Sequence, residues 1–326
     1  MNIPNKKVWI LITVDLENMN TPLLEGKYKR NLFSIETIQP LMNILERYNI
    51  KVVFFASVFE CCRFGKNEIC TVLKYLHSAG HDIELHTHPV WCYGKEHMWQ
   101  YPLKEQINII RHGRELINEW LGKDPIAHRA GAYGINRDTI EALRQNGFSI
   151  DSSMFFKHEN CKLNWSINKI VRKHNILEIP VTGFYRQSYF NFSFFKLKYK
   201  KKFIKTDIDW CSLNELKAFI NYAIKYNIKF ITLFMHSYSF IMHDSRYRSF
   251  KTNENNVKKL DTFIRICLQN ENIQFMTLTE FWKMYQQNQQ IFSEDDHVPI
   301  ISRNIDVFQK RNQEQNHGSH SNLTGQ

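Results

Sequence analysis

The chain has 326 residues, of which 43% are hydrophobic and 14% aromatic, so it can bury a sizeable core and is not a disordered protein. Lys and Arg outnumber Asp and Glu by 43 to 32, which gives a formal net charge of +11. No apolar stretch approaches the roughly 20 residues that span a bilayer as a helix, and no recognised nucleic-acid motif accompanies the basic excess.

The first predicted element is a buried strand that ends in two acids. Residues 8–14 are mostly apolar and rich in β-branched side chains, and they lead directly into Asp15 and Glu17. A continuous apolar run is typical of a strand buried on both faces of a parallel sheet. Side chains at i and i+2 of a strand point the same way, so we expect both carboxylates at the carboxyl edge of that sheet. The alternative is that they begin a solvated loop.

The rest of the chain alternates predicted helices with predicted strands. In chain order these are helix 35–48, strand 52–57, helix 67–79, strand 82–88, helix 103–121, a short strand ending near 128–131, helix 137–146, strand 148–151, strand 176–181, helix 213–226, strand 229–236, helix 254–269 and strand 273–277. Repeated strand–helix units indicate a mainly parallel sheet, and seven or eight of them indicate a closed or nearly closed barrel. Pro180 counts against a central position for strand 176–181.

The third predicted strand delivers two imidazoles to its end. His86 and His88 are two residues apart and are followed by Pro89, which would stop the strand. For an isolated His-x-His pair, surface or packed histidines are the commoner outcome. The carboxylate pair with the same spacing reverses this preference and favours a shared metal ion.

Candidate site residues converge because the carboxyl ends of parallel strands share one rim, where such folds carry their active sites. The side chains expected on this rim are Asp15, Glu17, His86, His88, Arg129, Asp151 and His236. Two imidazoles and one carboxylate make a three-ligand site that is typical of catalytic zinc, although non-haem iron uses the same set. A second acid and a further histidine could serve as general base and general acid, which indicates metal-assisted hydrolysis of an amide.

Two segments outside the rim stand out. The lysine run at 196–205 is interpreted as a solvated, mobile insert; the alternative is a patch that meets a phosphate-bearing substrate or a membrane surface. From residue 286 the chain turns polar, so we expect one barrel domain over 1–285 and a disordered tail over 286–326.

The cysteines indicate a reducing compartment. There are seven, an odd number, with no Cys-x-x-Cys spacing, and Cys61 and Cys62 are adjacent. Lys6, Lys7 and the run 8–14 imitate a signal peptide, but the run is short and has no small-residue cleavage site. We therefore expect reduced thiols in a cytoplasmic protein.

Four segments resemble the motifs of the polysaccharide deacetylases, which remove acetyl groups from sugars. Residues 13–17 resemble the first motif, in a branch that carries Asp-x-Glu, and residues 80–89 resemble the second, in its His-x-His-Pro variant. Residues 128–134 resemble the Arg-x-Pro-Tyr motif, with one extra residue and no proline, and residues 230–236 resemble the last motif.

The resemblance implies a (β/α)7–8 distorted barrel of the glycoside hydrolase and deacetylase type over roughly residues 8–280. It implies metal-dependent removal of an acetyl group from an N-acetylated sugar or glycan precursor, in cell-surface polysaccharide biosynthesis, with Zn²⁺ as the expected ion. The implied metal ligands are Glu17, His86 and His88, and the implied catalytic residues are the base Asp15, Arg129 that orients it, and the acid His236. Asp151 and Glu178 are candidate partners of the ligands or simple strand-end groups.

Other readings stay open. The chain could be a non-catalytic carbohydrate-binding relative, or a C–N hydrolase that acts on a small ring amide. A nucleic-acid partner has only the lysine run in its favour. The substrate could be nucleotide- or lipid-linked, and any membrane contact would be peripheral, through residues 196–205. Trp91, Trp99, Tyr133 and Trp210 could present flat faces to sugar rings or pack in the core.

Overall fold

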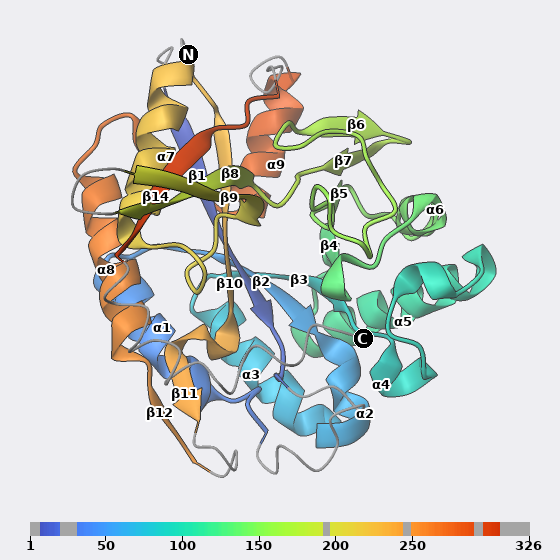
Figure 1. The fold of residues 1–326 in the computed structure, drawn as a ribbon. Coiled ribbons are helices and arrows are strands. Elements are labelled where there is room, and N and C mark those ends of the chain that lie inside the picture. The colour runs from blue at the N-terminus through green and yellow to red at the C-terminus, as the bar shows by residue number, and fades with distance from the viewer. Residues whose placement is uncertain (1–6, 20–30, 192–195, 244–248, 290–295, 307–326) are drawn as a thin grey trace.

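A curved, nearly all-parallel sheet forms the centre of the molecule (Figure 1). The computed structural model describes residues 7–19, 31–191, 196–243, 249–289 and 296–306. The sheet runs in the order β10-β1-β2-β3-β4-β5-β7-β6, with β13 paired to β1. Its strands are β1 (Val8–Leu16), β2 (Val53–Ser57), β3 (Asp82–Thr87), β4 (Ala127–Ala130), β5 (Ile150–Asp151), β6 (Val171–Lys173), β7 (Ile176–Glu178), β10 (Phe230–His236) and β13 (Ile273–Phe275).

Helices cover the outside of this sheet, as a parallel arrangement requires. They are α1 (Ile35–Arg47), α2 (Cys61–Phe64), α3 (Lys66–Ser78), α4 (Val90–Tyr93), α5 (Leu103–Leu121), α6 (Arg137–Gln145), α7 (Leu213–Tyr226), α8 (Glu254–Leu268) and α9 (Leu278–Gln287). The Ser34 hydroxyl accepts a hydrogen bond from the Thr37 backbone N–H and so caps α1. Among the described residues, no helix is both long and apolar enough to cross a bilayer.

The first strand is buried on both faces because alternate side chains enter two different clusters. Ile10, Ile12 and Val14 belong to the large cluster shared with the helices. Trp9 and Leu11 belong to a second, inner cluster, which Phe281 of α9 also joins. The predicted barrel fold and the buried first strand are therefore confirmed. Strand β7 ends at Glu178, two residues before Pro180, and its neighbour β6 pairs with it antiparallel at the edge of the sheet.

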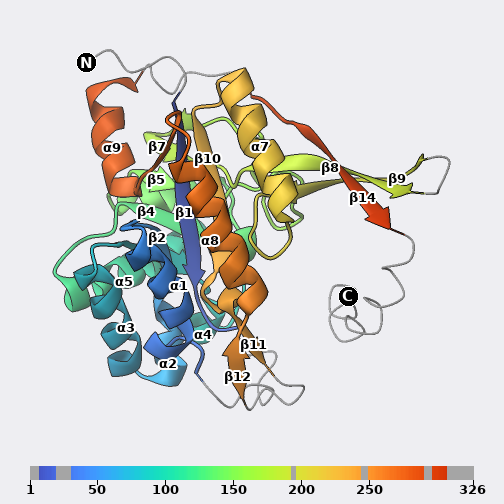
Figure 2. The ribbon, with the colours of Figure 1, turned by 90° about the vertical axis from the view of Figure 1, so that its left-hand side faces the viewer.

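A second sheet was not predicted. It contains β8 (Gly183–Asn191), β9 (Lys196–Lys205) and β14 (Ile300–Asp306) in the order β14-β8-β9, and Figure 2 shows it projecting from one side of the barrel. A further hairpin joins β11 (Ile241–His243) to β12 (Phe250–Thr252).

The second sheet contradicts two predictions, that the lysine run at 196–205 is a mobile insert and that disorder begins at residue 286. The lysine run is an ordered strand rather than a mobile insert, because it pairs with β8 along its length. Disorder does not begin at residue 286, because α9 continues to Gln287 and β14 pairs in parallel with β8. The rest of the predicted tail, residues 290–295 and 307–326, lies outside the described residues.

The prediction that all cysteines are reduced is also contradicted. A disulfide joins Cys62 in α2 to Cys92 in α4, across a sequence separation of 30 residues. A disulfide between the adjacent residues Cys61 and Cys62 is unfavourable. Cys62 can still pair with Cys92, which the fold places next to it. The other five cysteines carry free thiols.

Candidate metal centre

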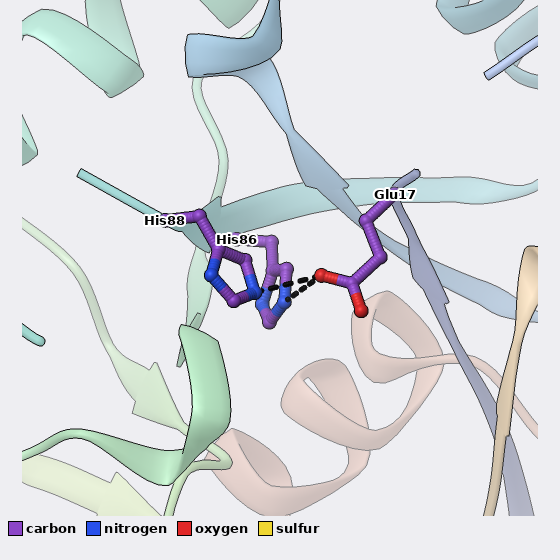
Figure 3. A group of neighbouring side chains, drawn as sticks. All are labelled: Glu17, His86 and His88. Atoms are coloured by element: carbon purple, nitrogen blue, oxygen red, sulfur yellow. Dashed lines mark hydrogen bonds and ion pairs between the residues drawn. The ribbon is translucent and has the colours of Figure 1, made fainter. Parts of the chain in front are cut away.

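Strands β1 and β3 bring one carboxylate and two imidazoles together at their carboxyl ends (Figure 3). The Glu17 Oε2 atom lies 2.7 Å from His88 Nε2 and 3.2 Å from His86 Nε2. One ligand atom from each residue lies within 4.8 Å of the others. The predicted ligand set, drawn from positions about 70 residues apart in the chain, is thus assembled in one place.

The backbone at Glu17 is fixed by the strand beside it. The Ser237 hydroxyl, just after β10, accepts from the Glu17 N–H at 3.3 Å and donates to the Glu17 carbonyl at 3.1 Å. The Tyr238 hydroxyl also lies 3.4 Å from Glu17 Oε1. These contacts hold the carboxylate on the rim rather than in a solvated loop, and the Glu17 side chain is only 12% exposed.

Each imidazole is oriented through its outer nitrogen. His86 Nδ1 lies 2.9 Å from the Arg129 carbonyl oxygen, which can only accept, so Nδ1 carries a proton and Nε2 is the nitrogen turned toward Glu17. His88 Nδ1 lies 2.8 Å from Glu96 Oε1. Such outer partners are typical of histidines that bind metals.

The electrostatics of the three groups favour a cation between them. Burial alone would raise the pKa of Glu17, but attraction to His88 and hydrogen bonds from both histidines hold it well below its usual range. Burial would lower the pKa of His88, yet Glu17 and Glu96 raise it well above its usual value. A group of side chains that stabilises a positive charge on His88 between two carboxylates also suits a divalent ion. The donor set of two nitrogens and one oxygen fits an ion that accepts nitrogen ligands.

Asp15 stands in different surroundings from Glu17. Its Oδ1 atom accepts a hydrogen bond from Arg129 Nη1 at 2.7 Å, while its Oδ2 atom lies 3.7 Å from His86 Nε2. Arg129 is fully buried and also donates to Ser152 through Nε and Nη2, both at 3.0 Å. A single charge-assisted hydrogen bond from this anchored arginine therefore fixes Asp15 beside the centre, outside the group of three donors.

His236 closes the site from the β10 side. Strand β10 pairs with β1 so that His236 lies opposite Asp15. Its ring stacks on Tyr238 with centroids 4.6 Å apart, and its Nε2 atom lies 3.6 Å from Glu17 Oε1. Burial lowers the pKa of His236, as does the nearby Lys205 ammonium, while the carboxylates around it act in the opposite direction.

Asp151 and Glu178 form a deeper network that reaches the ligand segment indirectly. Asp151 Oδ1 lies 2.7 Å from His128 Nδ1, and His128 Nε2 lies 2.9 Å from the hydroxyl of Thr87, the residue between the two ligand histidines. Burial and the neighbouring Asp151 raise the pKa of Glu178 well above its usual value. They support the strand ends rather than the imidazoles themselves.

Sequence reasoning missed three features of the site. Glu96 lies in a loop whose sequence has no motif or periodicity that would mark it as a site residue. Gly131 packs against the His88 ring, and a Cβ added there would lie 2.5 Å from His88 Cε1. Lys205 lies inside the lysine run, yet it is 5% exposed, with its Nζ atom 2.9 Å from the Tyr133 hydroxyl and 3.1 Å from Asp207 Oδ2.

The four aromatic residues proposed to face sugars differ in position. Tyr133 is buried and holds Lys205, so it packs in the core. Trp99 stacks on His97 with centroids 5.4 Å apart, and Trp91 lies against Phe64. Trp210 is 52% exposed.

Comparisons with known proteins bear on the family and the fold. Residues 34–150 match the family model described as polysaccharide deacetylase. A curated relative, the "peptidoglycan deacetylase-like protein FGM2" of Gibberella zeae, is 28% identical over 160 residues, which is 46% of this chain and 44% of that protein. The chain thus spans less than half the length of this relative. The matched family segment contains the two histidines and Arg129 but neither Glu17, Asp15 nor His236.

Two solved structures share the fold. A "putative polysaccharide deacetylase" from Mycobacterium smegmatis superposes with a TM-score of 0.61 at 17% identity, covering 91% of this chain and 96% of that one. PuuE allantoinase superposes with a TM-score of 0.54 at 12% identity, covering 87% and 92%. The resemblance to polysaccharide deacetylases and the predicted fold class are confirmed.

Proposed function

We propose that this chain, which shares the family segment and the fold of the polysaccharide deacetylases, is a metal-dependent hydrolase that removes an acetyl group from an N-acetylated sugar. The observation that carries the proposal is the convergence of Glu17, His86 and His88 on one point beside the Asp15–Arg129 pair. A ligand triad next to a separate, oriented carboxylate is the arrangement that amide hydrolysis needs.

In this proposal Glu17, His86 and His88 hold a divalent ion, with zinc the expected one. A bound ion of this kind polarises the amide carbonyl and lowers the pKa of water. Asp15 accepts the proton of the attacking water, and the hydrogen bond from Arg129 holds that carboxylate in its orientation. His236, across the site, delivers a proton to the departing amine nitrogen. The stacked Tyr238 ring limits the rotation of His236.

The proposed substrate is an N-acetylated saccharide of a cell-surface polysaccharide or its precursor. A cytoplasmic location would make a nucleotide- or lipid-linked precursor the natural substrate. The disulfide between Cys62 and Cys92 favours an oxidising compartment instead. Labelling of thiols in freshly lysed cells distinguishes the two locations, because reduced Cys62 and Cys92 would be alkylated and oxidised ones would not.

The decisive experiment measures acetate release from a panel of N-acetylated sugars, sugar nucleotides and chitooligosaccharides by protein supplied with zinc. Release that depends on the metal supports the proposal. A protein that binds these sugars but takes up no zinc is a carbohydrate-binding relative without catalysis. Opening of a small ring amide without acetate release would favour the second hydrolase reading, to which the shared fold with an allantoinase lends support.

A further inference from the structure

The exposed side chains of the β8–β9 hairpin take no part in the proposed reaction. Strand β9 is an edge strand of the three-stranded sheet that projects from the barrel (Figure 2). Four of its lysines are exposed, and within the described part of the chain none of them forms an ion pair with an acid: Lys198, Lys200, Lys201 and Lys202. Arg186 of β8, by contrast, is neutralised by Glu215 at 2.5 Å.

Exposed apolar side chains gather at the same sheet. The described residues include eight large hydrophobic side chains that are exposed, and four of these belong to the sheet or its immediate flank. Leu197 and Tyr199 of β9 are 53% and 55% exposed, Ile300 of β14 is 60% exposed, and Trp210, just after β9, is 52% exposed. Leu197 and Tyr199 lie together at one end of β9, whereas Ile300 lies on the opposite edge strand, beside Tyr185 of β8. Neighbouring exposed apolar groups such as the pair on β9 mark an interaction surface.

Two simpler explanations account for the exposed lysines of β9 but not for the exposed apolar side chains on the same strand. Lysines on an edge strand prevent unwanted strand pairing, and lysines also attract any soluble polyanion. Neither explanation accounts for Leu197 and Tyr199, which are exposed to water on the same strand as these lysines. Lysine stems and aromatic rings at a polar–apolar boundary are, however, typical of groups that sit at the surface of a bilayer.

We propose that the β8–β9 hairpin docks the protein on an anionic lipid bilayer. The lysine ammonium groups attract the phosphates of the headgroups, while Leu197 and Tyr199 enter the interface. Trp210, with the Lys202 ammonium 5.8 Å from its ring, marks the level of the headgroups. The contact is peripheral and needs neither the metal centre nor a substrate, so it can be tested apart from the proposed function.

The test is co-sedimentation of the full chain with vesicles of phosphatidylglycerol and phosphatidylcholine, against vesicles of phosphatidylcholine alone, at about 0.1 M salt. The charge variant combines Lys198→Glu, Lys200→Glu and Lys201→Glu, and its conservative version uses Gln at the same positions. The apolar variant combines Leu197→Ser and Tyr199→Ser. We expect the charge variant and the apolar variant each to lower the partition coefficient about tenfold or more.

A matched control changes the net charge equally at exposed lysines of α3, α5 and α7: Lys74→Glu, Lys104→Glu and Lys217→Glu. Circular dichroism shows whether each variant is folded, and the Gln version serves if the Glu version is not. The proposal is overturned if the wild type ignores anionic vesicles, or if the control variant loses binding as much as the charge variant. Loss of binding in the charge variant with full binding in the apolar variant also overturns it, because the surface would then serve a soluble polyanion.

Discussion

Asp15 and Glu17 lie two residues apart, yet their neighbours assign them different tasks. Glu17 faces both imidazoles, whereas Asp15 is held by a buried arginine. We predict that His88→Ala abolishes retention of metal, because it removes one of three donors. Asp15→Asn should keep the metal and lower turnover by a factor of about 100 or more, the usual contribution of a general base. Metal content after dialysis and acetate release together measure both effects.

The control for these variants is His112→Ala, which removes an imidazole on α5 that bonds to Tyr93 outside the centre. This variant should keep both metal and turnover. Loss of the metal in Asp15→Asn would show that Asp15 is itself needed to hold the ion. Full activity in His88→Ala would show that the proposed ligand set is incorrect.

Lys205 is the one buried ammonium among the lysines of β9 whose side chains the structure describes. Burial disfavours its charge, but Tyr133 and Asp207 outweigh this and raise its pKa above the usual value. Asp207 is fully buried as well. Lys205→Met would leave that carboxylate without its cation, so we predict a loss of about 3 kcal/mol in the free energy of unfolding. Urea denaturation measures it.

Tyr133→Phe is the matched variant for Lys205, since it removes one hydrogen bond and leaves the Lys205–Asp207 ion pair. It should cost about 1 kcal/mol. Equal losses in both variants would mean that the hydroxyl, rather than the charge, determines the stability of this region.

The turn after β4 shows how an element can constrain a ligand. Gly131 is followed by Ala132 and Tyr133, both with positive φ, at 47° and 58°. These angles bring the backbone against the His88 ring, so Gly131→Ala must push that ring aside. We predict that metal affinity falls about 10- to 100-fold, the usual effect of disturbing a partner of a metal ligand. Titration calorimetry with zinc measures the affinity.

Gly147→Ala is the control, because the added Cβ meets nothing within 4 Å although φ is +78°. That variant should lose some stability through backbone strain and keep its metal affinity. Unchanged zinc affinity in Gly131→Ala would mean that the turn can move away from His88 without cost.

Elements with strong local signals were predicted well, and those that depend on distant pairing were not. The apolar runs of β1 and β2 and the stripe of α5 fix their identity within a few residues. Strand β9 has no apolar pattern of its own, so its sequence predicts a solvated lysine run. It is a strand because it pairs with β8, which the sequence of β9 alone does not show. Strand β14 pairs with β8 from more than a hundred residues away, inside a polar segment.

The same distinction holds for the site. Glu17, His86 and His88 were predictable because strand ends share one rim. Glu96 was not, since only the folded loop brings it 2.8 Å from His88. The disulfide partner of Cys62 was likewise hidden in the tertiary structure.

A buried acid away from the metal centre contributes to the pH dependence of stability for the whole molecule. Glu84 of β3 is fully buried, and its Oε2 atom accepts hydrogen bonds from the backbone N–H groups of Ile126 and Ala127. Burial, followed by repulsion from Asp82, raises the pKa of Glu84 from 4.5 to about 8. Between pH 4.5 and about 8, Glu84 therefore keeps its proton in the folded protein and has lost it in the unfolded chain.

This difference in proton binding makes the protein less stable as the pH rises. The contribution of Glu84 is fully present below pH 4.5 and is lost as the pH rises to about 8. Glu84→Gln mimics the protonated acid at every pH, so the free energy of unfolding should depend less on pH between 4.5 and about 8. At pH 8 the variant should be more stable than the wild type by on the order of a few kcal/mol. Urea unfolding at pH 5 and pH 8 measures the change. Exposed Glu68→Gln on α3 is the control, and an equal slope in Glu84→Gln and wild type would show that the Glu84 carboxyl is ionised in the folded protein.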